Sequence, residues 1–272
     1  MKKIFAVLLI LAATIFTGCG GNDSGKDEQE SSAPKKSGNV FFVGVDDEFA
    51  PMTFRDEQGE LVGFDIDLAN EAAKRLGVTF QFRPIDWNGK ETAIRSGSID
   101  LIWSACDITD EYKAYMIFSK PYMDNRQIVL VPNDDASEIN SEKDFAGKRV
   151  GTQSGSNSET YIDETPELRK IFADFKTYHS FKDAFKALND GKIDLLIVDE
   201  IAARYEMSKS QDAFRAIDLT VGPITQFGIG FRKNDVELRD RIQKVFDEMI
   251  QDGTAKKISE KWFETDIVKF DR

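Results

Sequence analysis

The hydrophobic residues of this chain fall into short continuous runs separated by helix-spaced faces. Apolar runs at residues 40–45, 78–82 and 99–103 are typical of buried strands. Helix-spaced apolar positions over 64–76 lie between the first two runs, and a shorter set over 90–96 precedes the third. This β-α-β-α-β order predicts a doubly wound α/β fold with a parallel sheet.

Two acidic residues open the first predicted helix. Asp65 stands where a side-chain cap is favoured, and Asp67 suits the positive end of the helix dipole. We therefore predict that Asp65 caps this helix and that Gly77 ends it.

One pattern occurs twice in the chain. The stretch from Ala93 to Asp107 is echoed by Ala187 to Glu200, and each has a helix end, a glycine, Ile-Asp-Leu, an apolar strand and an acidic residue. Two such units predict two similar α/β lobes that face one another. The alternative is that Gly-x-Ile-Asp marks only a common helix-to-strand turn. Because ligands bind beyond the carboxyl ends of strands in α/β sheets, we expect a polar loop from Ser104 onward to form part of a site.

The alternation of strands and helices breaks twice, which predicts two crossings between the lobes. The breaks lie near residues 122–125 and 227–231. We therefore assign residues 40–124 and 228–272 to the first lobe and residues 125–227 to the second.

The N-terminus has the pattern of an export signal. Lys2 and Lys3 precede an apolar run over 4–13, which is too short to span a bilayer, and small residues lead to Cys19. This arrangement resembles the bacterial lipobox, so we predict a lipoprotein signal peptide at 1–19 and a lipid anchor on Cys19. The alternative is a plain cleaved signal with an unmodified cysteine. Residues 20–39 are rich in glycine, serine and charge, and are predicted to form a flexible tether.

Composition narrows the range of functions. The chain is 41% hydrophobic and 31% charged, with a net charge of −12 that becomes −14 once Lys2 and Lys3 are removed. This charge argues against nucleic acid and against a patch for anionic lipid. Beyond Cys19 the one other cysteine is Cys106, so no internal disulfide is possible, and the single histidine, His179, leaves too few ligands for a Cys/His metal site. We expect Cys106 to be a small core residue, and we expect no cofactor.

Several segments in order resemble one family. They are the Phe49-Ala50-Pro51 loop, Val62 to Leu68 (VGFDIDL), Gly97-x-Ile99-Asp100, Ile108 to Glu111 (ITDE), Phe118-Ser119-x-Pro121-Tyr122, Phe145-x-Gly147-Lys148 and Gly191 to Asp194 (GKID) before Asp199. From residue 40 to 263 the chain resembles the extracytoplasmic solute-binding proteins of ABC importers, polar amino acid type. The resemblance implies two lobes joined by two hinge strands, closure around an amino acid or related cationic amine, and docking on a membrane permease. It also implies an extracytoplasmic monomer.

The resemblance implies a set of ligand-binding residues. An acid, two aromatic walls and two main-chain contacts come from the first lobe, and a polar loop and an acid for the ligand's ammonium come from the second. These residues are Asp46, Phe49, Trp87, Ser104 and Ala105, followed by Gln153, Ser156, Asn157 and Asp199.

Two positions depart from the family pattern. An arginine that would fork onto the ligand's α-carboxylate is replaced by Tyr112, and a threonine is replaced by Asp107. Tyrosine offers one neutral donor, and an aspartate would repel a carboxylate. We therefore add Asp107 and Tyr112 to the site and leave two interpretations open. In one, the acid-rich, aromatic cleft binds an amine without a carboxylate. In the other, Asp107 turns outward or is paired, and the carboxylate of an ordinary amino acid is held by Ser156, Asn157 and the helix start.

Two other classes of function are weighed against this one. An enzyme on this fold could use Glu111 or Asp107 as a general acid, although the sequence offers no nucleophile–base pair. A surface protein that senses a ligand without transporting it is the other alternative.

Overall fold

The computed structural model describes residues 39–210 and 212–268. The chain divides into two units, residues 1–36 and 37–272, and only the second contains described residues. The predicted signal peptide at 1–19, its lipid anchor at Cys19 and nearly all of the tether at 20–39 lie outside the described residues. Among the helices that the model describes, none is long and apolar enough to cross a bilayer.

The first lobe is built from both ends of the described chain. Its elements are β1 (Val40–Val45), β2 (Glu48–Phe49), β3 (Thr53–Arg55), β4 (Leu61–Val62), α1 (Phe64–Leu76), β5 (Thr79–Pro84), η1 (Trp87–Gly89), α2 (Lys90–Arg95), β6 (Leu101–Asp107), α3 (Asp110–Lys113), β7 (Met116–Phe118), α8 (Val236–Gln251) and α9 (Thr254–Phe263).

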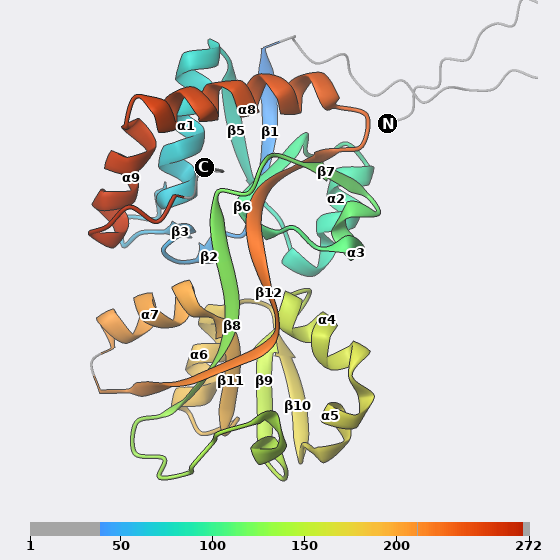
Figure 1. Cartoon of the computed structure of the whole chain (residues 1–272), viewed down its shortest axis with the longest axis vertical. Coiled ribbons are helices and arrows are strands. Elements are labelled where there is room, and N and C mark those ends of the chain that lie inside the picture. Colours follow the sequence, from blue (N-terminus) through green and yellow to red (C-terminus); the bar gives the residue numbers. More distant parts are fainter. Residues whose placement is uncertain (1–38, 211, 269–272) are drawn as a thin grey trace, which may run out of the picture. The chain divides into compact units, whose positions relative to one another are not determined.

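The second lobe lies between these two parts of the sequence. Its elements are η2 (Glu142–Phe145), β9 (Arg149–Gln153), α4 (Asn157–Glu164), α5 (Pro166–Ile171), β10 (Asp174–Tyr178), α6 (Phe181–Asn189), β11 (Leu195–Asp199) and α7 (Glu200–Lys209). Two long strands, β8 (Met123–Pro132) and β12 (Phe214–Arg232), run through both lobes (Figure 1).

The long strands join the sheets of the two lobes. Within the described residues the strand order is β10-β9-β11-β8-β12-β6-β1-β5, with β7 paired to β12, and β2-β3-β4 form a separate small sheet. The pairs β1–β5, β1–β6, β9–β10 and β9–β11 are parallel, whereas β8 and β12 pair antiparallel with their neighbours. The predicted fold of two doubly wound lobes with two hinge strands is confirmed. The predicted boundaries, 124/125 and 227/228, fall in the ribbon where Asp124 pairs with Gln226 and Met123 with Phe227.

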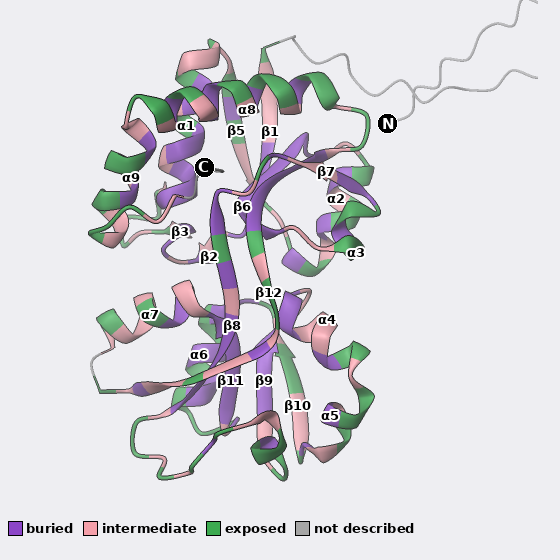
Figure 2. Cartoon of the chain, viewed as in Figure 1, coloured by how far each residue is buried: buried purple, intermediate pink, exposed green. Residues whose placement is uncertain are grey.

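Helices cover both faces of the first lobe's sheet. The helices α1, α8 and α9 contact one another on one side, and α2 and α3 lie on the other (Figure 1). Two separate groups of buried residues correspond to these faces, one around Val43 and Phe246 and one around Ile94 and Ile102. The central strands are buried and the outward faces of the helices are exposed (Figure 2).

The repeated sequence pattern has the same structure in both lobes. In each copy a short helix, α2 or α6, ends before a glycine and leads into a central strand, β6 or β11. The two glycines, Gly97 and Gly191, have φ angles of 74° and 66°, a conformation that glycine adopts without a steric penalty.

The aspartate of each repeat holds the first strand of its own lobe. Asp100 accepts a 2.8 Å hydrogen bond from the Phe42 amide, and Asp194 accepts a 2.7 Å bond from the Arg149 amide. In each case the aspartate's own amide donates back to the same residue's carbonyl at 2.8 Å. In both lobes, therefore, the aspartate of the Gly-x-Ile-Asp pattern hydrogen-bonds one strand to its neighbour.

Two local predictions are corrected. The residue at the N-cap of α1 is Gly63, and Asp65 is buried inside the helix instead of capping it. The segment Ser104–Asp107, predicted as a polar loop, continues β6, because β12 lies beside it and pairs with it.

Candidate functional site

The predicted ligand residues of the two lobes meet at one small cavity. Its volume is about 10 Å³, which is room for about one water molecule. Ten of the eleven predicted residues line it, and Tyr112 does not. The lining residues are Asp46, Phe49, Trp87, Ser104, Ala105, Asp107, Gln153, Ser156, Asn157 and Asp199.

The end of β6 lines the cavity with Ser104, Ala105 and Asp107. Ala105 has a φ angle of 45°, and its amide donates a 2.7 Å hydrogen bond to the buried carboxylate of Asp65, which also accepts from the Tyr122 hydroxyl at 2.9 Å. The main-chain amide of Ala105 is thus directed at Asp65 rather than at a ligand. The Ser104 hydroxyl accepts from the Asp46 amide and lies 2.6 Å from the Thr53 hydroxyl.

Two carboxylates lie beside the paired hinge strands β8 and β12. Asp107 ends β6 and Asp199 ends β11, so they are the acids of the two sequence repeats. The side-chain amide of Asn125, on β8, donates to Oδ1 of both, at 3.0 Å for Asp107. Gln127 also donates to Oδ1 of Asp199 at 2.6 Å, and the Thr225 hydroxyl on β12 donates to Oδ1 of Asp107. All of these hydrogen bonds are made to the first carboxylate oxygen, Oδ1, of each acid.

Burial raises the pKa of both acids. It raises the pKa of Asp107 to about 7, and the negative charge of Asp199 adds to the rise. Burial also raises the pKa of Asp199 to about 6, against the opposing effect of the amide donors on Asn125 and Gln127. Near neutral pH the pair therefore gains from a cation between its members.

A third acid joins the two lobes on another side of the cavity. The Gln153 amide donates a 2.6 Å hydrogen bond to Oδ2 of Asp46, and the Glu48 main-chain amide donates to Oδ1 at 3.0 Å. Burial raises the pKa of Asp46 to about 6.

The start of α4 faces the cavity from the second lobe. Ser156 caps the helix by accepting from the Glu159 amide at 3.2 Å. Asn157, the first residue of the helix, is 8% exposed, and its side-chain Nδ2 has no acceptor among the described residues. A buried amide donor at the positive end of a helix is suited to an anionic group.

Tyr112 is the one predicted ligand residue outside the lining of this cavity. Its hydroxyl donates a 3.0 Å hydrogen bond to the Gly155 carbonyl in the opposite lobe, and burial raises its pKa far above the usual value. Lys90, a residue with no predicted role, lies over the Tyr112 ring with its Nζ 4.5 Å from the ring centroid. One of its contacts is with the Gly155 carbonyl of the other lobe, which no local stretch of sequence reveals.

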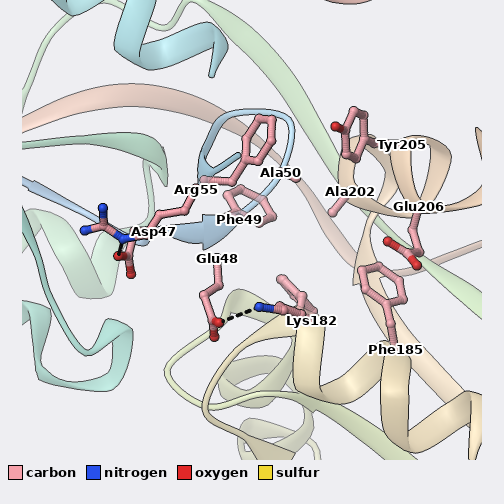
Figure 3. Close-up of a pocket in the computed structure, with 12 residues that line it drawn as sticks. Asp47, Glu48, Phe49, Ala50, Arg55, Lys182, Phe185, Ala202, Tyr205 and Glu206 are labelled. Carbon is pink, nitrogen blue, oxygen red and sulfur yellow. Dashed lines mark hydrogen bonds and ion pairs between the residues drawn. The ribbon is translucent and has the colours of Figure 1, made fainter. Parts of the chain in front are cut away.

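A larger cavity lies beside the first one and shares Phe49 with it. Its volume is about 460 Å³, and its walls come from β2 and β3 of the first lobe and from α6 and α7 of the second. Phe49 stands opposite Phe185, Tyr205 and Glu206, whereas the Arg55 side chain points toward Asp47 (Figure 3). A 3.1 Å ion pair between Glu48 and Lys182 bridges the lobes at its edge (Figure 3).

The remaining candidates have ordinary structural roles. Cys106 is buried within β6 among apolar side chains, and burial raises its thiol pKa. The His179 side chain is 66% exposed. Glu111 is exposed on α3 and accepts a hydrogen bond from the Thr160 hydroxyl in the second lobe. Among the residues that the model describes, no group of three or more His, Cys, Asp and Glu side chains is arranged to hold a metal.

Comparison with known proteins gives one consistent result. The family of bacterial extracellular solute-binding proteins, family 3, matches residues 41–265. The L-cystine-binding protein TcyJ of Escherichia coli (strain K12) is 29% identical over 264 residues, covering 97% of each chain. The arginine-binding extracellular protein ArtP of Bacillus subtilis (strain 168) is 32% identical over 269 residues, covering 97% of this chain and 98% of ArtP.

A solved structure agrees with these relatives. It is a substrate-binding protein of an ABC uptake transporter from Streptococcus pneumoniae with bound histidine. Its TM-score is 0.80 at 33% identity, and the match covers 85% of this chain and 95% of that one.

Proposed function

Because the chain belongs to family 3 of the bacterial extracellular solute-binding proteins, we propose that it captures a polar amino acid between its two lobes for an ABC importer. Its relatives are binding proteins for cystine, arginine and histidine, and the family is extracellular. A membrane permease is the partner that this role requires.

One observation supports an amino acid over an amine without a carboxylate. The cavity is lined by two opposite kinds of group, the Asp107–Asp199 pair, which suits a cation, and the Asn157 amide at the start of α4, which suits an anion. An α-amino acid carries an ammonium and a carboxylate close together, so it satisfies both sides. Asp107 is also hydrogen-bonded to Asn125 and Thr225, which matches the interpretation in which it is paired.

In this proposal seven of the predicted residues have a defined task. Asp199 and Asp107 hold the ammonium through their second carboxylate oxygens, and Asn157 with the Ser156 end of α4 holds the carboxylate. Asp46, Phe49 and Trp87 surround the ligand's side chain, and the acid among them favours a polar or cationic one. Since the cavity holds only about one water as it stands, the lobes must part for entry.

The test uses amino acids with their decarboxylated counterparts. Thermal shift and titration calorimetry compare L-arginine with agmatine, L-histidine with histamine, and L-cystine with cystamine. We expect at least one amino acid to bind and its amine to bind at least tenfold more weakly. Stronger binding of the amines would reverse the assignment, and no binding by any of the six would remove it.

We also propose that the mature protein is a monomer anchored to the membrane by lipid on Cys19. Stable anchoring needs the lipid chains that a lipobox cysteine receives. A Cys19→Ser variant should appear in the soluble extracellular or periplasmic fraction, whereas the parent chain fractionates with membranes. Equal fractionation of the two would contradict the anchor.

A further inference from the structure

Lys90 is a buried cation that joins the two lobes. It begins α2 in the first lobe and is only 5% exposed. Its Nζ donates a 2.7 Å hydrogen bond to the Gly155 carbonyl of the second lobe and a 3.3 Å bond to the Trp87 carbonyl of its own lobe. It also lies 4.5 Å from the Tyr112 ring centroid and 5.2 Å from that of Trp87.

Burial at the start of a helix destabilises the positive charge of Lys90 unless its contact with the second lobe offsets that cost. The start of a helix repels a cation, and burial lowers the pKa of Lys90. If the lobes part, the ammonium loses Gly155 and regains water. Its charge-assisted bond to the Gly155 carbonyl therefore exists only in the closed arrangement, whereas the Trp87 carbonyl and the two aromatic rings belong to its own lobe.

The contact at residue 155 requires a glycine. A Cβ built on it would lie 2.6 Å from the Cα and 2.9 Å from the amide nitrogen of Asn88, which are main-chain atoms of the opposite lobe. Its φ angle of +72° adds a second reason for glycine. The backbones of the two lobes are thus in direct contact at the point where Lys90 and the Tyr112 hydroxyl share the Gly155 carbonyl.

We propose that Lys90 is a latch, a positioning residue whose ammonium holds the Gly155 carbonyl and so stabilises the closed cleft. Lys90 does not line the small cavity, so the latch acts on every ligand alike and also favours closure before a ligand arrives. It rests on the proposed function only in the expectation that the two lobes open and close.

The ligand-free protein gives the first test. Spin labels at Lys233→Cys and Asp163→Cys, two exposed positions in different lobes, report the distance between the lobes by pulsed electron resonance. The background carries Cys19→Ser, and Cys106 is buried. We expect open and closed populations, with Lys90→Met lowering the closed-to-open ratio roughly 10- to 100-fold. Lys113→Met is the matched control, because Lys113 is exposed on α3 and pairs only with Asp110. Identical distance distributions for Lys90→Met and its parent would overturn the latch.

Ligand kinetics give the second test and separate the latch from direct ligand contact. With L-arginine and agmatine as probes, Lys90→Met should raise each dissociation rate by the same factor and should not slow association, since ligands meet the open form. A loss confined to L-arginine would mean that Lys90 contacts the carboxylate, and the latch would be wrong. If neither probe binds, the proposed ligand class fails, while the distance measurement still decides the latch.

Discussion

The paired acids at the hinge make ligand affinity depend on pH in a calculable way. If the pKa of Asp107 is about 7, about nine-tenths of the molecules carry its charge at pH 8 and about one-tenth at pH 6. A ligand whose ammonium needs that charge should therefore bind about tenfold more weakly at pH 6 than at pH 8. Asp199, with a pKa of about 6, adds at most about a twofold loss over the same range.

Asp107→Asn tests this reasoning because it keeps the shape of the side chain. The variant should bind more weakly at pH 8, and most of its pH dependence should disappear, leaving the small contribution of Asp199. Titration calorimetry at pH 6, 7 and 8 with L-arginine measures the slope, since arginine's own charges change little in this range. Agmatine replaces L-arginine if only the amines bind.

A control is needed for the neighbouring acid. Asp199→Asn removes the other charge that lies beside the Asn125 amide. Because losing a buried charge pair costs about 2–5 kcal/mol, this variant should lose roughly 30- to several thousand-fold in ligand affinity. The pH account is refuted if the parent protein binds equally at pH 6 and pH 8, or if Asp107→Asn keeps the full tenfold slope.

Three further predictions concern stability and recognition. The raised pKa values of Asp46, Asp65, Asp107 and Asp199 mean that the folded state holds more protons than the unfolded chain between about pH 4 and pH 7. The unfolding temperature of the ligand-free protein should therefore rise as pH is lowered from 8 to 5, and calorimetry showing the opposite trend would contradict the shifts. Asn157→Leu should weaken L-arginine about tenfold and agmatine little, because only the carboxylate uses that amide, and equal losses in calorimetry would place the carboxylate elsewhere. Asp65→Ala should lower the free energy of unfolding by about 3 kcal/mol, since the Ala105 amide and Tyr122 hydroxyl lose their buried acceptor, and a change under about 1 kcal/mol in urea titration would show that water replaces it.

Much of this architecture could be predicted because local pattern and long-range structure agree. The repeat that ends in Asp107 and Asp199 predicted two equivalent strands, and both acids line one cavity at the hinge. Helix α1 has the predicted limits, Phe64 to Leu76, because its apolar spacing is regular and Gly77 ends it. Where one face of an element is buried, the sequence period alone determines the orientation.

The failures lie where tertiary contacts override local preference. Asp65 looks like a helix cap, but α1 packs so that its carboxylate meets the Ala105 amide. The polar sequence from Ser104 to Asp107 is typical of a loop, yet β12 pairs with it and makes it a strand. Asn125 bridges the two acids only because β8 passes between β11 and β12, a neighbourhood that no single stretch of sequence reveals.

Lys90 and Tyr112 show a second reason why the sequence alone does not predict every contact of the site. Tyr112 was assigned to the ligand because of the position it occupies, whereas its hydroxyl binds Gly155 across the cleft. Lys90 follows a Trp-Asn-Gly turn and has the composition of a solvated helix start, and only the approach of the second lobe buries it. Contacts that depend on closure leave no periodic signal in either lobe.

The most direct measurement of the central idea is a crystal structure of the mature protein with the tightest-binding amino acid of the panel. We expect its ammonium at roughly 3 Å from carboxylate oxygens of both Asp199 and Asp107, and its carboxylate at the start of α4 beside Asn157. An amino acid bound with these ends reversed, or seated outside the cavity that the two lobes enclose, would contradict the account.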